Sequence, residues 1–402
     1  MRKLLLTRLM LFAMLPLFIF SCGKDDDPAP QVLQPKLDGV YVYGTNTVAD
    51  VPTAPAARLS GATLNPAKSS GAATMPGVYG KYMYIGANST IQISEVENEV
   101  ATVYGAENGG TRIAGEELDH TDVQDEFIQG TLEANAAPIE ISEEGLYYLF
   151  VNTNDMHFRL MRVEPEMFGD TQPGQWTTGT ALPMVSADRD GAVFEANGVS
   201  LRGESGYKYR LNKGYEVYND GSMATLTFLG VESYGAAWDA GVNELIYKDE
   251  NIPHQETGVF TVRLEYDAAT GEWTETKIKD YSTTQVGLFG NAYTLPNGEA
   301  AAWNEAYGLT TPEKDGNVYT WSWNDVALIE GGEFVLLENG EWGGLAVLYN
   351  DATERAGNAF DEGVTKAEGS ENFMVVAGGE YDISLAIDVE TGTRTLTIAN
   401  SN

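Results

Sequence analysis

Four aromatic residues recur at a fixed spacing in two parts of this 402-residue sequence. The interval from Trp176 to Tyr215 is the same as the interval from Trp303 to Trp342, so the pair repeats as a unit. Exposed Trp and Tyr side chains present broad apolar faces, which suit stacking on the C–H face of a sugar ring. The spacing indicates two candidate stacking platforms. The alternative is that these aromatics cap the ends of the domains that carry them.

The segments around these aromatics have the pattern of an antiparallel β protein. Three stretches predict a closing β-hairpin, because two runs of alternating apolar and polar residues flank a turn rich in Asp, Asn, Thr or Gly. They lie at 145–163, 258–278 and 379–398. No long stretch has helical periodicity with caps at both ends. We expect an all-β fold of tandem immunoglobulin-like β-sandwich domains, with the platform aromatics in loops between strands.

Two sequence markers set the domain boundaries. The segment Val42-Tyr43-Gly44 has counterparts at Met167-Phe168-Gly169 and Leu288-Phe289-Gly290. The interval between the last two markers equals the interval between the second and third hairpins, which start at Gly258 and Gly379. Agreement between independent markers indicates tandem repeats. The predicted domains are 36–165, a spacer without tryptophan, and two candidate binding domains at 166–283 and 284–402.

The N-terminus has the features of a lipoprotein signal peptide over residues 1–21. Basic residues precede an apolar run of about a dozen residues, which is shorter than the roughly 20 needed for a membrane span. The run ends at Ser21-Cys22, and Cys22 is the only cysteine in the chain. We therefore expect Cys22 to be acylated, with residues 22–35 as an acidic, proline-containing tether. The alternative is an ordinary secretory signal with an incidental cysteine.

The charge of the chain argues against several partners. The net charge is −35, and removing Arg2, Lys3 and Arg8 with the signal peptide changes it by −3, to −38. A surface this acidic repels nucleic acid and anionic lipid. We therefore expect no nucleic-acid partner, and membrane attachment only through the lipid anchor.

Two segments resemble a known family. Residues 168–176 and 334–342, together with the layout of lipoprotein signal, N-terminal Ig-like domain and tandem binding domains, resemble the SusE/SusF family of Bacteroidetes outer-membrane lipoproteins. The resemblance covers nearly the whole mature chain, with short and degenerate motifs. It implies a protein anchored in the outer membrane and facing the cell exterior. The implied partners are a glucan, with a starch-like α-glucan first and a β-1,3-glucan as the alternative, and a SusC/SusD-type importer.

The resemblance also implies the binding residues. The stacking pairs fall on Trp176 with Tyr215 and on Trp303 with Trp342. Family sites use Lys or Arg on sugar hydroxyls, a role that Lys208, Arg210 and Lys213 would fill in the second domain. In the third domain Val335 and Leu337 replace Lys208 and Arg210, so we expect that site either to use Glu338, Asn339 or Glu341 or to bind more weakly.

Catalytic and metal sites have little support in the sequence. His120, His157 and His254 are the only histidines, and none is spaced to ligate a metal with another. There is no Gly-x-Ser-x-Gly nucleophile motif. Acidic turns such as 388–392 could hold Ca²⁺, but hairpin turns favour Asp for local reasons. We expect no enzyme activity, cofactor or metal. The remaining alternative from a different class is a structural or adhesin-like surface protein.

Overall fold

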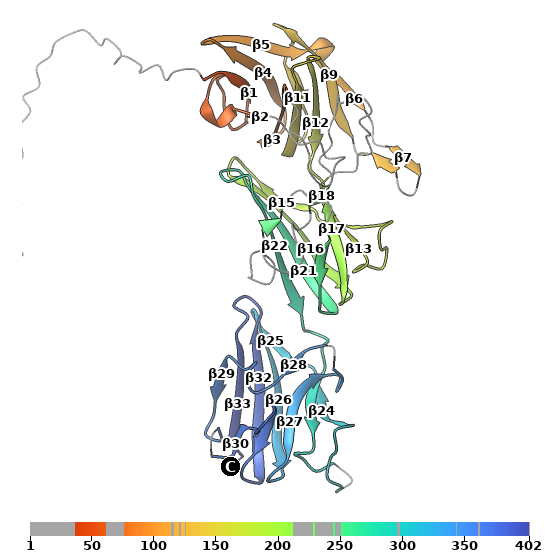
Figure 1. Ribbon diagram of the computed structural model, residues 1–402, viewed down its shortest axis with the longest axis vertical. Helices are drawn as coiled ribbons and strands as arrows, with labels where there is room; N and C mark the ends of the chain where they lie inside the picture. The colour runs from red at the N-terminus through yellow and green to blue at the C-terminus, as the bar shows by residue number, and fades with distance from the viewer. Residues whose placement is uncertain are drawn as a thin grey trace, which may run out of the picture. The chain divides into compact units, whose positions relative to one another are not determined.

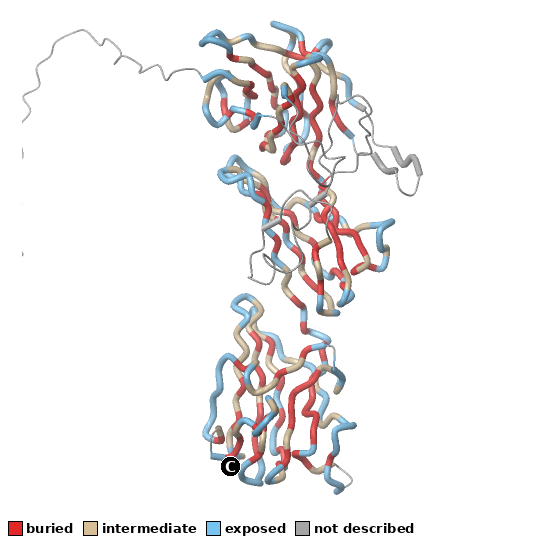
Figure 2. The backbone as a smooth tube through the Cα atoms, viewed as in Figure 1, coloured by how far each residue is buried: buried red, intermediate tan, exposed pale blue. Residues whose placement is uncertain are grey.

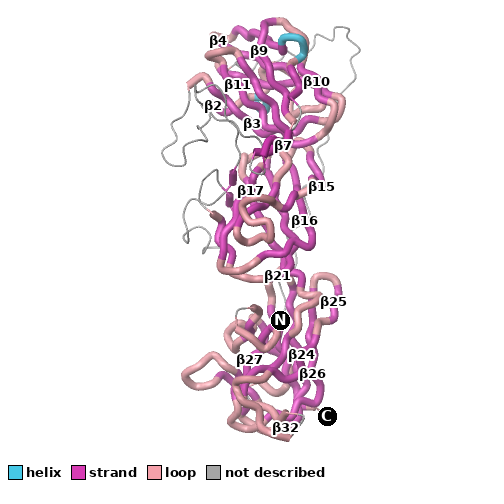
Figure 3. The backbone as a smooth tube through the Cα atoms, turned by 90° about the vertical axis from the view of Figure 1, so that its right-hand side faces the viewer, coloured by secondary structure: helices cyan, strands magenta, loops and turns pink. Residues whose placement is uncertain are grey.

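The computed structural model describes residues 37–61, 76–113, 116–119, 122–124, 126–211, 228–229, 244–245, 251–295, 298–342, 344–360 and 362–401. The predicted signal peptide, Cys22, the tether, Lys213 and Tyr215 lie outside these ranges. The described chain is almost entirely β-strand, with two short 3-10 turns at Pro55–Ala57 and Glu107–Gly109 (Figure 3). None of the described residues belongs to a helix long and apolar enough to cross a membrane.

The strands pair within three groups, which are coloured from orange to blue in Figure 1. The first group, residues 39–162, contains a ten-stranded sheet in the order β1-β4-β5-β9-β12-β11-β3-β2, with β10 on β4 and β6 on β9, and a separate β7–β8 ribbon. Its strands are β1 (Gly39–Gly44), β2 (Ser60–Gly61), β3 (Val78–Ile85), β4 (Ser89–Glu97), β5 (Val100–Ala106), β6 (Thr111–Ile113), β7 (Glu116–Asp119), β8 (Asp122–Gln124), β9 (Phe127–Ala134), β10 (Ile139–Ile141), β11 (Gly145–Asn152) and β12 (His157–Arg162).

The second group, residues 166–280, forms two five-stranded sheets. One has the order β14-β13-β17-β18 with β20 on β17, and the other has the order β15-β16-β21-β22-β19. The strands are β13 (Glu166–Gly169), β14 (Thr180–Ala181), β15 (Met184–Ala187), β16 (Gly191–Leu201), β17 (Ser205–Arg210), β18 (Phe228–Leu229), β19 (Glu244–Leu245), β20 (Ile252–His254), β21 (Gly258–Asp267) and β22 (Trp273–Asp280).

The third group, residues 286–400, repeats this plan. One sheet has the order β24-β23-β27-β31-β30 with β28 on β27, and the other has the order β25-β26-β32-β33-β29. The strands are β23 (Val286–Gly290), β24 (Ala306–Thr310), β25 (Glu313–Asp315), β26 (Val318–Leu328), β27 (Glu333–Glu338), β28 (Ala346–Val347), β29 (Glu354–Ala356), β30 (Val364–Lys366), β31 (Phe373–Val375), β32 (Gly379–Asp388) and β33 (Arg394–Asn400).

The core of the third group lies between its two sheets, as in a β-sandwich. Leu288 and Phe334 from one sheet pack with Trp321, Leu385 and Leu396 from the other. Buried residues alternate with more exposed ones along β26, β32 and β33, whereas β23 and β27 are buried along nearly their whole length (Figure 2). Fully burying one such side chain contributes about 1.5–3 kcal/mol. The prediction of an all-β sandwich-type fold is confirmed.

The three predicted hairpins are present. β11 pairs with β12, β21 with β22 and β32 with β33, all antiparallel. The second and third groups also share a bulge: the register between β16 and β21 shifts between Ala196 and Val199, and that between β26 and β32 shifts between Trp323 and Val326.

The predicted domain boundaries fall between the strand groups, and no ladder among the described strands joins one group to another. Residues Leu37–Asn402 nevertheless form one compact unit. The ring of Tyr82, for example, lies 5.3 Å from that of Tyr266 and 5.4 Å from that of Trp273. Separate folding of the three groups therefore stays a prediction.

Candidate functional site

In the second group, β13 and β17 bring aromatic and charged side chains to one face of a sheet. Phe168 on β13 is directly opposite Lys208 on β17, and Glu166 is opposite Arg210. The residues between them, Met167, Tyr207 and Tyr209, belong to the inter-sheet core. Because side chains alternate along a strand, Glu166, Phe168, Lys208 and Arg210 lie on the opposite face. We call these four residues the outer face of the second group.

Trp176 lies against this outer face. Its ring is 5.4 Å from that of Phe168 in an edge-to-face arrangement, and the ammonium of Lys208 is 5.9 Å from its centre. Trp176 remains 37% exposed. Edge-to-face aromatic packing orients a ring and contributes about 0.5–1.5 kcal/mol beyond area burial. Phe168 and Lys208 therefore hold Trp176 while part of its indole stays open to solvent.

The loop that carries Trp176 is closed by its own backbone. Gly169 accepts a hydrogen bond from the amide of Gln172 and donates one to the carbonyl of Gln175, and Gln172 accepts one from Gln175. Thr171 and Gln172 are buried, and the Gln172 side chain accepts a hydrogen bond from Thr180. The backbone at Gly169 has φ +145°, and a Cβ there would lie 2.5 Å from the backbone of Tyr207, so only glycine fits.

The two predicted cations differ in their contacts. Arg210 forms an ion pair with Glu166, and its guanidinium lies 5.1 Å from the centre of the Phe168 ring. Lys208 is largely buried beneath Trp176. Both cations lie on the predicted face, as the strand alternation required. Arg210 is held by the ion pair with Glu166, whereas Lys208 lies against the ring of Trp176.

The third group keeps the contact between a phenylalanine and an exposed tryptophan, but it has apolar residues in place of the two cations. Phe289 on β23 is opposite Val335 on β27, and the Trp303 ring lies 5.8 Å from that of Phe289, again edge to face. Val335 and Leu337 occupy the positions of Lys208 and Arg210. Both are fully buried in a small cluster with Phe289, onto which Ala306, Ala346 and Leu348 pack. Trp303 is 40% exposed.

Trp342 lies in a tight loop, residues 339–342, which we call the Trp342 loop. Asn339 and Gly340 both have positive φ, 53° and 72°. The loop is closed where Glu338 donates its amide hydrogen to the Leu345 carbonyl and its carboxylate accepts the Leu345 amide hydrogen, both at 2.8 Å. A Cβ at Gly340 would lie 2.6 Å from that of Ala306, in the segment that follows Trp303. The segments carrying Trp303 and Trp342 therefore meet at Ala306.

The described tryptophans divide into two classes. Trp273, Trp321 and Trp323 lie in strands and are 3%, 0% and 5% exposed. Trp176, Trp303 and Trp342 lie in loops and are 37%, 40% and 58% exposed. Exposing so much indole to water forgoes hydrophobic stabilisation, so burial does not account for the presence of tryptophan at these three positions.

Glu338 differs from the other acceptors suggested for a sugar in the third group, because its carboxylate has contacts within the protein. Glu338, one of three acceptors suggested for a sugar in the third group, is already bound to the Leu345 amide and to the ammonium of Lys279, 3.2 Å away. Both of these contacts go to the same carboxylate oxygen, so this oxygen already takes part in the closure of the Trp342 loop. Asn339 and Glu341 are not buried and remain candidates.

His254 and two aspartates in hairpin turns have structural explanations, whereas His120 lies outside the described residues. His254 is buried between the rings of Tyr207 and Phe260, and burial lowers its pKa to about 4. The Asp388 carboxylate accepts hydrogen bonds from the amides of Glu390 and Thr391, which lower its pKa, and Asp267 does the same in the equivalent turn. The described residues contain no group of three or more His, Cys, Asp or Glu side chains placed to hold a metal ion.

The sequence interpretation missed the supports of the site. Phe168 and Phe289 served there only as repeat markers, although each one braces an exposed tryptophan. Their position just before a Gly and shortly before a Trp was the available signal. Lys279 was also missed, because nothing local marks a lysine at the end of a hairpin strand as a partner of the next repeat.

The sequence and the structure have only distant similarity to known proteins. No model of a known protein family matches the sequence. No curated protein matches it either. Among solved structures, the chain is similar to one titled "Crystal Structure of SusF from Bacteroides thetaiotaomicron", with 14% sequence identity over 90% of this chain and 72% of that chain and a TM-score of 0.21. This is a distant structural similarity, and the assignment of function depends on the residues of the chain itself.

Proposed function

We propose that this chain is a non-catalytic, cell-surface lipoprotein that binds a polysaccharide through the exposed tryptophans of its second and third strand groups. The observation that carries the proposal is the division among the tryptophans. Those in strands are buried, whereas Trp176, Trp303 and Trp342 are exposed, and two of them are braced by a phenylalanine from the outer face of a sheet. A braced, half-exposed indole provides a flat apolar surface whose orientation is set before a sugar arrives.

The proposed ligand is a glucan, with a starch-like α-glucan first. Support comes from the resemblance of residues 168–176 and 334–342 to SusE/SusF proteins, and from the paired aromatics, which suit a chain of successive sugar rings. A lipid on Cys22 and the tether would keep the protein on the outer membrane beside a SusC/SusD-type importer. The acidic surface is compatible with a neutral polymer and unfavourable for a polyanion.

A preference for long ligands follows from the same proposal. Each platform offers one or two aromatic faces, and each stacking contact contributes on the order of 1 kcal/mol, so a single site is weak. Two sites on one chain gain through effective concentration when one polymer spans both. We expect the protein to bind polysaccharide clearly more tightly than short oligosaccharides of the same linkage.

The test is electrophoresis of the protein through native gels that contain glycogen, pullulan or laminarin. Retardation by one of these, and its loss when Trp176, Trp303 and Trp342 are all replaced by Ala, is the expected result. Val185→Ala, which truncates an exposed apolar residue on β15, is the control and should leave retardation unchanged. Equal retardation of the unmodified and triple variants would overturn the proposal and favour a protein-contacting role. Release of reducing sugar would contradict the non-catalytic assignment.

A further inference from the structure

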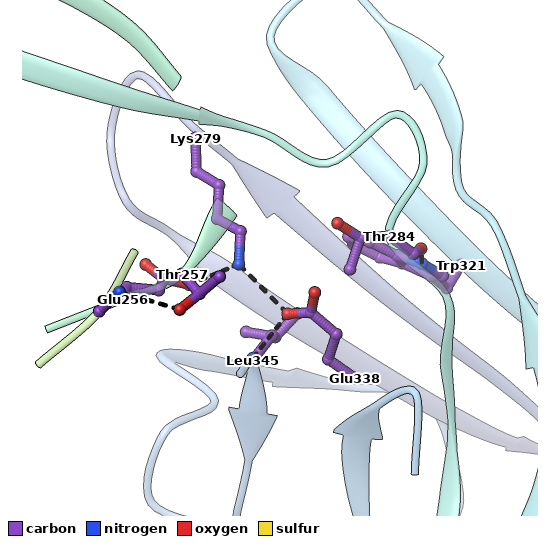
Figure 4. Close-up of polar contacts among 8 residues, drawn as sticks. Glu256, Thr257, Lys279, Thr284, Trp321, Glu338 and Leu345 are labelled. Carbon is purple, nitrogen blue, oxygen red and sulfur yellow. Dashed lines mark hydrogen bonds and ion pairs between the residues drawn. The ribbon is translucent and has the colours of Figure 1, made fainter. Parts of the chain in front are cut away.

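Lys279, the penultimate residue of β22 in the second group, has its charge buried against the third group. Its side chain is only 5% exposed. The ammonium lies 2.8 Å from the carboxylate of Glu256 and 3.2 Å from that of Glu338 (Figure 4). It is also 5.0 Å from the centre of the Tyr281 ring. A buried ammonium needs such partners because leaving water is costly for a charge.

Glu338 connects this lysine to the Trp342 loop. The same carboxylate oxygen that faces Lys279 accepts the amide hydrogen of Leu345, and Figure 4 shows both contacts converging on it. Glu338 precedes the Trp342 loop and Leu345 follows it, so this contact joins the segments on either side of the loop. Lys279 therefore holds the Glu338 carboxylate that binds the Leu345 amide next to the Trp342 loop.

Residues that follow Lys279 are also attached to the third group. Tyr319 donates a hydrogen bond to Asp280 at 2.9 Å, and Tyr281 packs into the third core. Trp321 donates from its indole nitrogen to the Thr284 carbonyl at 2.9 Å. Asn339, the first residue of the Trp342 loop, donates its amide hydrogen to the carbonyl of Gln285 at 2.8 Å. The ion pair is thus one of several attachments within a short segment, so Lys279 is held close to Glu338.

We propose that Lys279 is a positioning residue for the Trp342 loop, so that the second strand group completes the ligand-binding face of the third. Lys279 does not touch the ligand. It fixes the Glu338 carboxylate, which fixes Leu345 and the loop between them, and so presents Trp342 beside the segment that carries Trp303. The ligand part of this inference rests on the proposed function, whereas the placement of Trp342 does not.

The first test observes Trp342 without any ligand. The full chain, with its seven tryptophans replaced by 5-fluorotryptophan, is studied by ¹⁹F NMR, and Trp342→Phe assigns the Trp342 signal. We expect Lys279→Met to shift and broaden this signal while that of Trp176 stays in place. Lys279→Arg should restore it, because a guanidinium can donate to both carboxylates. Lys366→Met removes the same charge from an exposed pair with Glu371 and should change nothing.

The second test measures affinity for glycogen and laminarin in a Trp176→Ala chain, in which only the third group still binds. We expect Lys279→Met to weaken binding by about two- to tenfold, the range expected when one side chain must be ordered on binding. Lys279→Arg should bind like the parent, and so should Lys366→Met.

Each outcome decides a different claim. An unmoved Trp342 signal in Lys279→Met, or a shifted signal that Lys279→Arg fails to restore, overturns the positioning role. A shifted signal with unchanged affinity overturns its part in ligand binding. Failure of the unmodified chain to bind either polysaccharide overturns the proposed function, and the ¹⁹F result still decides the positioning role. Should Lys279→Met fail to fold, Glu338→Gln must shift the Trp342 signal, and if it does not the inference fails.

Discussion

The second and third strand groups have the same sheet order and the same bulge but different chemistry at equivalent positions. On the outer face, Lys208 and Arg210 are replaced by Val335 and Leu337. Between the sheets, Glu275 and Lys277 on β22 stand where β33 has Leu396 and Ile398. Tyr207 donates a hydrogen bond to Glu275 at 2.5 Å in the second group, whereas its counterpart, Phe334, packs against other apolar residues.

Some features are the same in both strand groups, whereas the charged and apolar side chains around these features differ. Both groups retain the sheet register and a phenylalanine that braces an exposed tryptophan. Charged and apolar side chains exchange around these fixed features, provided that each buried charge has a partner, such as Lys277 beside Glu275 at 3.0 Å. If the proposed function is correct, the braced tryptophan is the common element of the two sites, and the surrounding residues distinguish them.

The largest expected effect comes from removing one platform at a time. Trp176→Ala leaves only the third group, and the pair Trp303→Ala with Trp342→Ala leaves only the second. Each should weaken polysaccharide retention about 100-fold, since the gain from two tethered sites is lost. Affinity electrophoresis on glycogen measures this. Complete loss from Trp176→Ala alone would show that the apolar platform of the third group is not a site.

The next effect concerns stability on the outer face. Arg210→Leu leaves the buried Glu166 without its cation and should lower the free energy of unfolding by about 3 kcal/mol. Adding Glu166→Leu should recover most of this loss, because the buried carboxylate that had lost its ion pair is then removed. Urea unfolding followed by circular dichroism measures both variants. A double variant as unstable as Arg210→Leu would show that the two faces are not interchangeable.

A smaller effect is expected at the ligand. The Lys208 ammonium lies 5.9 Å from the centre of the exposed Trp176 ring, so Lys208→Ala should weaken binding by about 1 kcal/mol, the typical contribution of one hydrogen bond. Calorimetric titration with glycogen in a chain carrying Trp303→Ala and Trp342→Ala isolates the second group. Lys366→Ala in the reciprocal Trp176→Ala chain is the matched control, because it truncates an exposed lysine of the third group, and it should leave affinity nearly unchanged. Equal losses in both would contradict a role for the cation.

The smallest effect lies in the turns that the two groups share. Hydrogen bonds from backbone amides lower the pKa of Asp267 and Asp388 below their unfolded values. Their contribution to stability is therefore present above the unfolded pKa and is lost as pH falls through the folded pKa. Asp388→Asn should lower the melting temperature slightly near neutral pH and not at all in strong acid. Addition of calcium should not change the difference. A calcium-dependent rise only in the unmodified chain would instead indicate a metal-binding turn.

The parts of the structure that were predictable are local in sequence. The hairpin of β21 and β22 follows from alternation on either side of an Asp-Ala-Ala-Thr-Gly turn, and the position of Trp342 in a loop follows from its Asn-Gly neighbours. The contact between Phe168 and Lys208 was not predictable, because it depends on the register of two strands that are far apart in the sequence. The Lys279–Glu338 pair joins different repeats, and in the sequence alone Glu338 looked like a ligand for a hydroxyl group.

The closed turns around Trp176 have an evolutionary consequence. The loop from Gly169 to Trp176 is markedly shorter than the loop from Gly290 to Trp303. The strands on either side keep their register despite this difference. Insertions in such a loop can alter which polymer curvature the tryptophan accepts without requiring a change in the core. After duplication, each repeat can thus acquire its own selectivity for a polysaccharide while its core stays unchanged. Exchanging the two loops by engineering is a direct way to alter this selectivity.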